Sequence, residues 1–141
     1  MMGVYFVSVN YWAVLASAII SMIIGSLWYG PLFGKQWMNL MGFGRKDINK
    51  AKSKGMAKSY LLAIIAALIV GFVLAHIIAY VNATTFTEGL GTGVWMWLGF
   101  VATVSLGSIL WEGKPASLYW INSLYWLVNL AIMGGILAVF Q

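Results

Sequence analysis

The sequence predicts an all-α membrane protein, a single domain over residues 1–141 that folds as a four-transmembrane-helix bundle. Hydrophobic residues make up 62% of the chain and charged residues 8%, against roughly 45–50% and 25% in soluble domains. Four uncharged apolar runs approach the ~20 residues that a helix needs to cross the hydrocarbon. None of them alternates as a β-barrel strand does, so helices must satisfy the backbone amides within lipid.

The predicted spans cover about residues 11–29, 59–81, 93–111 and 119–140. The first and third end just before Pro31 and Pro115, whose missing amide and constrained preceding residue stop a helix. Tryptophan and tyrosine favour the headgroup level and gather at these boundaries, as Trp28, Tyr29 and Trp111 illustrate. The proline breaks and the aromatic residues therefore agree with the hydropathy.

A basic loop over residues 31–58 holds most of the lysines and arginines. This excess predicts that the loop is cytoplasmic, so that both termini and the loop over residues 82–92 lie outside a multi-pass protein of the plasma membrane. We expect a short helix here whose cations contact anionic lipid headgroups: Arg45, Lys46, Lys50, Lys54 and Lys58. A solvated segment that fixes topology and a dedicated lipid or protein site both stay open. A nucleic-acid partner is not expected, because the cations cluster in one loop.

Small residues recur every four positions on three of the predicted helices, a pattern that lets helices approach closely in lipid. The predicted packing residues are Ala63, Ala67, Gly71 and Ala75 on the second helix and Gly99 and Gly107 on the third. The first helix carries a matching stripe that includes Ser17, Ser21 and Gly25. We expect close contact among these three helices. The extent of small-residue surface also favours a homo-oligomer or a larger membrane complex.

Polar side chains within the spans are candidates for a polar bundle interior: Ser17, Ser21, His76, Asn122 and Asn129. His76 is the one ionisable side chain deep in a predicted span, and such residues are functional candidates. A neutral imidazole can also bond a carbonyl or hydroxyl group of the next helix, and the asparagines can serve as interhelical glue rather than line a path. Both interpretations stay open at this stage.

The first and third predicted helices resemble each other at their ends, in residues 25–31 and 107–115. Both stretches begin with Gly-Ser and end with a proline that follows a tryptophan, and small residues upstream recur at the same offset. Because these helices run in the same direction, we expect a parallel repeat of two helical hairpins.

The residue inventory argues against several chemistries. The chain has no cysteine, which excludes disulfides and thiolate metal sites. His76 lies toward the opposite face of the membrane from Asp47, and no phosphate-binding glycine loop follows a predicted strand. We therefore expect no catalytic residues, no metal and no cofactor, and the chain is not predicted to be an enzyme.

A stretch from Trp28 to Trp37, Trp-Tyr-Gly-Pro-Leu-Phe-Gly-Lys-Gln-Trp, resembles the core motif of a known family, as do residues 52–60, 97–101 and 121–122. The family consists of small four-helix prokaryotic integral membrane proteins catalogued as a domain of unknown function. The resemblance covers nearly the whole chain. It implies the fold and a membrane location but no activity.

Two hypotheses about function follow. The first is an oligomeric small-solute or ion permease or channel, motivated by the repeat and the polar interior. A coupled proton antiporter is disfavoured, because no aspartate or glutamate lies within a predicted span. The second is a non-transporting structural or accessory subunit that binds other membrane proteins or lipid.

Overall fold

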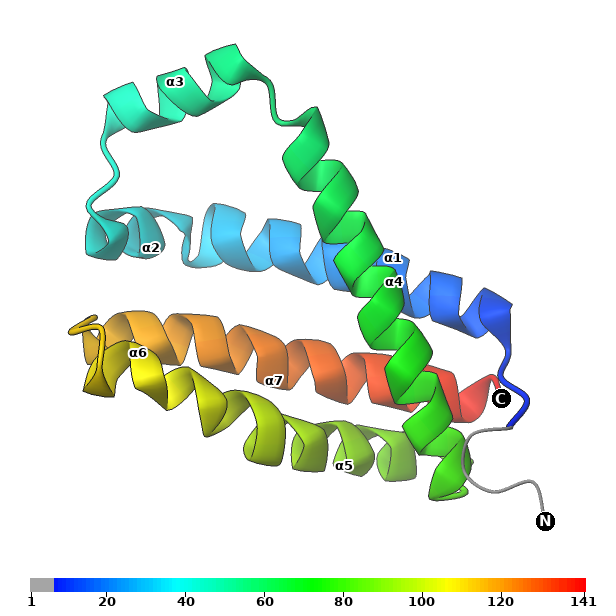
Figure 1. The fold of residues 1–141 in the computed structure, drawn as a ribbon. Helices are drawn as coiled ribbons and strands as arrows, with labels where there is room; N and C mark the ends of the chain where they lie inside the picture. Colours follow the sequence, from blue (N-terminus) through cyan, green and yellow to red (C-terminus); the bar gives the residue numbers. More distant parts are fainter. Residues whose placement is uncertain (1–6) are drawn as a thin grey trace.

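The computed structural model describes residues 7–141, apart from the side chain of Ile48, and contains no strand in that range. Four helical segments are long and apolar enough to cross a membrane: Tyr11–Leu32, Ala57–Tyr80, Phe86–Leu110 and Ala116–Val139. The predicted all-α, four-helix fold is confirmed. Asn10 donates a hydrogen bond to the Phe140 carbonyl (2.6 Å), so the two ends of the described chain meet at one end of the bundle (Figure 1).

The first span consists of α1 (Tyr11–Leu27) and a π-helical turn, η1 (Trp28–Leu32). The Asn10 side chain caps α1 by accepting hydrogen bonds from two backbone amides. The sequence predicts an end before Pro31, but the π-helical turn carries the helix through this residue. The wider turn departs from the ordinary hydrogen-bond ladder, so a residue without an amide is tolerated there.

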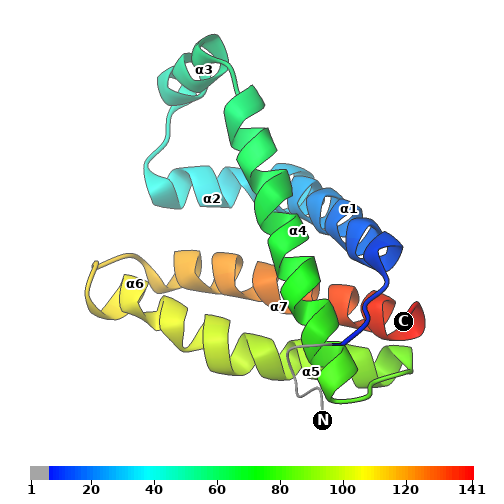
Figure 2. The ribbon, with the colours of Figure 1, turned by 45° about the vertical axis from the view of Figure 1, so that its right-hand side comes forward.

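Two short helices form a cap at the opposite end of the bundle from the termini (Figure 1). The first, α2 (Gly34–Met41), ends at Gly42, which has a positive φ of 75°. The second, α3 (Arg45–Lys54), is the short basic helix that the lysine spacing predicts. At its start the Asp47 carboxylate accepts a hydrogen bond from the Gly44 amide (2.9 Å). Both views show α3 held away from the other helices (Figures 1 and 2).

The second span is α4 (Ala57–Tyr80), and the third opens with α5 (Phe86–Trp97). The predicted outer loop over residues 82–92 is therefore too long, because the connection ends at Thr85. Thr85 caps α5 by accepting a hydrogen bond from the Glu88 amide. Glu88 thus lies in the first helical turn of a span, where its charge suits the positive end of the helix dipole.

The third span is irregular after α5. It continues as a π-helical turn, η2 (Leu98–Ala102), a 3-10 turn, η3 (Val104–Leu106), and a short α6 (Gly107–Leu110). The fourth span, α7 (Ala116–Val139), is continuous and begins directly after Pro115, earlier than predicted. Half of the apolar window of α7 is buried, against 11% for the third span. The fourth span is therefore the central helix of the bundle.

Close helix approaches occur within each of the two hairpins. In the first, α1 crosses α4 at Gly71, where an added Cβ would lie 2.8 Å from Ser17 Oγ. In the second, α5 lies beside α7 (Figure 2). Gly89 contacts the backbone of Gly134, and Gly93 contacts the backbone carbonyl of Leu130. The absence of side chains at these glycines allows the backbones to touch.

The predicted stripe of the third helix does not make the expected contacts. Gly99 is exposed, and an added Cβ there would meet nothing within 4 Å, while at Gly107 it would meet only the ring of Trp111, at 3.7 Å. The close contacts of this span are made instead by Gly89 and Gly93. The sequence places these glycines in or beside a loop, because glycine disfavours helix interiors when nothing packs against it.

On the second helix, Ala67, Gly71 and Ala75 are buried, whereas Ala63 is exposed. Every residue from 57 to 66 is exposed within the described chain. The small-residue stripe of α4 thus packs only along its later part, and α4 diverges from α1 toward the α3 end (Figures 1 and 2).

Candidate functional site

Aromatic side chains of η1 form hydrogen bonds with the first part of α7. The Tyr29 hydroxyl donates a hydrogen bond to Asn122 Oδ1 (2.7 Å), and the Trp28 indole donates to the Ile121 carbonyl (2.9 Å). From the other side, the Trp97 indole of α5 donates to the Ser123 carbonyl (2.7 Å). Residues 121–123 of α7 are thereby held between two spans.

A second polar group lies one to two turns further along α7. The Ser21 side chain lies near Tyr125, and an added Cβ at Gly25 would lie 3.1 Å from the tyrosine hydroxyl. Asn129 is fully buried and reaches the same hydroxyl only through a long contact of 3.5 Å. Its Oδ1, like the hydroxyl of buried Ser123, has no partner among the described residues.

The predicted interior residues do not form one continuous site. Ser17 is fully buried, but its hydroxyl donates to the Val14 carbonyl of its own helix (2.8 Å). His76 is half-buried, and its Nδ1 bonds the Phe72 carbonyl of its own helix (2.8 Å) instead of a group on the next helix. Since a carbonyl oxygen only accepts, Nδ1 carries the proton in this contact. The ring packs between Phe72 and Tyr80, apart from the asparagines.

The polar interior ends in the middle of the bundle. Beyond Asn129, toward the termini, the core consists of closely packed apolar side chains such as Ile78, Met133 and Leu137, each at most 1% exposed. The backbone contact of Gly89 with Gly134 closes the same region. The buried polar side chains therefore do not lead to the end of the bundle where the termini lie.

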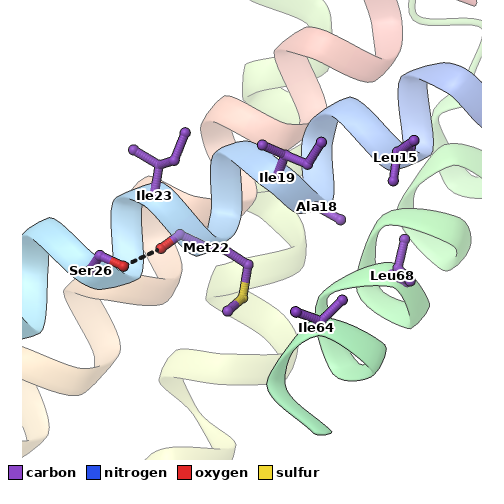
Figure 3. A pocket seen from close by; sticks show the side chains of 8 residues that line it. All are labelled: Leu15, Ala18, Ile19, Met22, Ile23, Ser26, Ile64 and Leu68. Atoms are coloured by element: carbon purple, nitrogen blue, oxygen red, sulfur yellow. Dashed lines mark hydrogen bonds between the residues drawn. The ribbon is translucent and has the colours of Figure 1, made fainter. Parts of the chain in front are cut away.

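An apolar groove opens between α1 and α4 on the lipid-facing side of the first hairpin, with a volume of about 380 Å³. Figure 3 shows Leu15, Ile19, Met22 and Ile23 of α1 on one side and Ile64 and Leu68 of α4 across from them. Ser26 is its one polar lining residue, and its hydroxyl donates to the Met22 carbonyl (3.0 Å). The groove is therefore suited to hydrocarbon.

A second largely apolar pocket, of about 450 Å³, lies under the α2–α3 cap. Its walls come from α2, α3 and the start of α4, with Trp37, Phe43, Met56 and Tyr60 among the lining residues. The predicted lipid-contacting cations are all exposed: Arg45, Lys46, Lys50, Lys54 and Lys58. Four of them lie on α3, so this helix has cations outside and an apolar pocket beneath it.

Sequence reasoning misses most side chains that hold the centre together. Trp28 and Tyr29 count only as membrane-interface aromatics, and neither Trp97 nor Tyr125 is among the candidate residues. The available signal is the polar atom that each ring carries, because a buried indole or phenol in lipid needs a hydrogen-bond acceptor. Only Tyr125 could have been found by its spacing from Asn122 and Asn129, because it is the one aromatic residue of this group on α7.

Four membrane-spanning helices with a hydrogen-bonded centre, an apolar lateral groove and a basic cap define the class as a small multi-pass α-helical membrane protein. The family model described as "Protein of unknown function (DUF1761)" matches residues 12–138. Because this match covers most of the chain, the protein belongs to this family. Neither the curated proteins nor the solved structures that were searched contain a match.

Proposed function

We propose that this protein is a non-transporting membrane component that binds anionic phospholipid at the first hairpin. The observation that carries the proposal is the divergence of α4 from α1 toward the α3 end (Figure 1), which leaves an apolar groove between the two helices, and α3 itself carries exposed cations. The acyl chains lie in the groove, and the phosphate lies at α3. One surface thus supplies both kinds of contact that a phospholipid needs.

Charge and burial both support this assignment. Lys46, Lys50 and Lys54 recur every four residues, so they share one face of α3, and each exposed cation contributes about 1 kcal/mol near an anionic membrane surface. The groove offers branched and flexible side chains, and its Met22 adapts readily to an irregular chain.

The transport hypothesis has less support from the geometry. The polar groups of the centre bond mainly one another and backbone carbonyls, as in the pairs Tyr29–Asn122 and Trp97–Ser123. Such contacts stabilise helix association at about 1 kcal/mol each in a membrane. Close apolar packing around Met133 lies between these groups and the terminal end of the bundle.

The proposal is tested with the full chain in nanodiscs that contain equal amounts of phosphatidylglycerol and phosphatidylcholine. Native mass spectrometry measures which lipid stays bound when the scaffold is removed. The parent protein retains phosphatidylglycerol. The triple variant Lys46→Glu, Lys50→Glu and Lys54→Glu loses this preference by more than roughly tenfold, since three attractive charges become repulsive.

The matched control reverses Lys35 and Lys114, which are exposed cations outside α3. This variant keeps most of the preference for phosphatidylglycerol. Equal retention of the two lipids by the parent, or equal loss in both variants, would show that α3 is not an anionic-lipid site. Flux of ions or neutral solutes through liposomes that contain the parent protein would favour the transport hypothesis instead.

A further inference from the structure

A separate polar pocket of about 290 Å³ lies on the second hairpin, between the irregular part of the third span and the start of α7. Its polar lining residues are Ser105, Ser108, Glu112, Tyr119 and Asn122. The remaining lining is formed by Val104 and Gly107. None of these residues belongs to the groove or to the basic cap described above.

The irregular part of the third span and the start of α7 supply the polar lining. Ser105 lies on η3, Ser108 on α6 and Glu112 in the turn after α6, while Tyr119 and Asn122 are three residues apart on α7 and so share one face of that helix. The turn after α6 fixes the backbone of Glu112. The Gly107 carbonyl accepts the amides of both Trp111 (2.9 Å) and Glu112 (3.3 Å).

Hydrogen-bond acceptors outnumber donors in the lining. Tyr119 already donates its hydroxyl hydrogen to the Ala102 carbonyl (2.7 Å), so its oxygen is left as an acceptor. The serine hydroxyls accept as well as donate, and Glu112 contributes a carboxylate. Asn122 Oδ1 accepts from Tyr29, and its amide group is the one obligate donor. The pocket lining contains no lysine or arginine.

We propose that this pocket binds a primary ammonium group, supplied by the headgroup of an aminophospholipid or by a small free amine. A primary ammonium carries a positive charge and three N–H donors, which match the carboxylate and the neighbouring oxygen acceptors. The Asn122 amide is placed to donate to a phosphate or hydroxyl oxygen next to the ammonium. A quaternary ammonium has the charge but no donor, so it leaves the acceptors unpaired.

The position of the pocket gives lipid headgroups direct access. Trp111, beside Glu112, is 86% exposed, and Val104 on the rim is 72% exposed. Tryptophan at a span boundary marks the headgroup level of the membrane. The site lies on the hairpin opposite α3 and recognises the opposite charge, so it stands independently of the proposed anionic-lipid function.

The test uses the full chain in nanodiscs with equal amounts of phosphatidylethanolamine and phosphatidylcholine, and native mass spectrometry measures the lipid that stays bound. Phosphatidylethanolamine is enriched on the parent protein by roughly fivefold, because both headgroups carry the positive charge but only the primary ammonium donates hydrogen bonds to Glu112 and the neighbouring acceptors. Glu112→Gln removes the enrichment, and Ser108→Ala reduces it. Glu88→Gln, the same change at the opposite end, leaves it intact.

A second arm distinguishes the source of the ammonium. Free ethanolamine is added to nanodiscs of phosphatidylcholine alone, and saturation-transfer NMR detects binding. If free ethanolamine binds the parent but not Glu112→Gln, and phosphatidylethanolamine is not enriched in the first arm, the site is assigned to a free amine. The proposal is overturned if Glu112→Gln and the parent behave alike in both arms. The α3 triple variant keeps the phosphatidylethanolamine enrichment, which separates this result from failure of the anionic-lipid proposal.

Discussion

Single glycines decide how closely the helices of the second hairpin approach. At Gly89 and Gly93 an added Cβ would overlap backbone atoms of α7, which cannot move aside as a flexible side chain can. At Gly91, on the same helix, it would meet nothing within 4 Å. Gly91 should therefore tolerate a larger side chain, whereas Gly89 and Gly93 should not.

Gly93→Leu should destabilise the protein by more than about 3 kcal/mol, because overpacking against backbone forces α5 away from α7. Gly91→Leu is the control and should change the free energy of unfolding by less than about 0.5 kcal/mol. Equilibrium unfolding in mixed micelles measures both. Equal tolerance of the two substitutions would contradict the close α5–α7 approach.

The sequence identifies polar side chains in the spans but not their partners. Asn122, Asn129 and Ser21 stand out because amides and hydroxyls are rare in lipid-facing helices, and the structure places all three on the α1–α7 side of the centre. His76 stands out for the same reason but lies elsewhere. Spacing along one helix shows which residues share a face. Only the packing shows which neighbouring helix that face contacts.

At the scale of the helix, the two hairpins differ in how they pack. α5 lies along α7 through backbone contacts, whereas α1 and α4 cross at Gly71 and then separate. The number, type and approximate position of the spans follow from hydropathy, since each must cross the hydrocarbon. The ends and irregular turns of the spans do not follow from hydropathy. Pro31 lies within a π-helical turn instead of ending the first span, and Gly89 lies within α5 against α7 instead of in a loop. The parallel repeat remains a prediction.

The separation of α1 and α4 predicts an effect of filling the groove. Ile64→Trp places a large ring among the lining residues. It should reduce retention of phosphatidylglycerol by roughly threefold or more, because the ring takes the place of part of the acyl chain and removes apolar contact area. Leu61→Trp is the control, because Leu61 is exposed on α4 but does not line the groove. Native mass spectrometry compares the two variants, and an equal effect of both would exclude the groove as the acyl site.

At the scale of the molecule, the two ends of the described chain meet at one end of the bundle, where Asn10 bonds Phe140, and the cationic α3 lies at the other. The positive-inside rule predicts that α3 faces the cytoplasm. The absence of cysteine makes this direction measurable, because any introduced thiol is unique.

Asn49→Cys on α3 should react with a membrane-impermeant maleimide only after cells are opened, whereas Gln141→Cys should react on intact cells. Both positions are exposed, so accessibility within the protein does not limit labelling. Labelling of Asn49→Cys on intact cells would reverse the predicted orientation.

Photo-crosslinking in nanodiscs tests lipid binding by the first hairpin most directly. Phosphatidylglycerol with a diazirine in its acyl chain is activated by light, and peptide mapping locates the adducts. We predict that adducts concentrate on the groove residues around Met22, Ile64 and Leu68 and disappear from them in the α3 triple variant. Adducts spread evenly over all lipid-facing helices, unchanged in that variant, would contradict a phospholipid site between α1, α4 and α3.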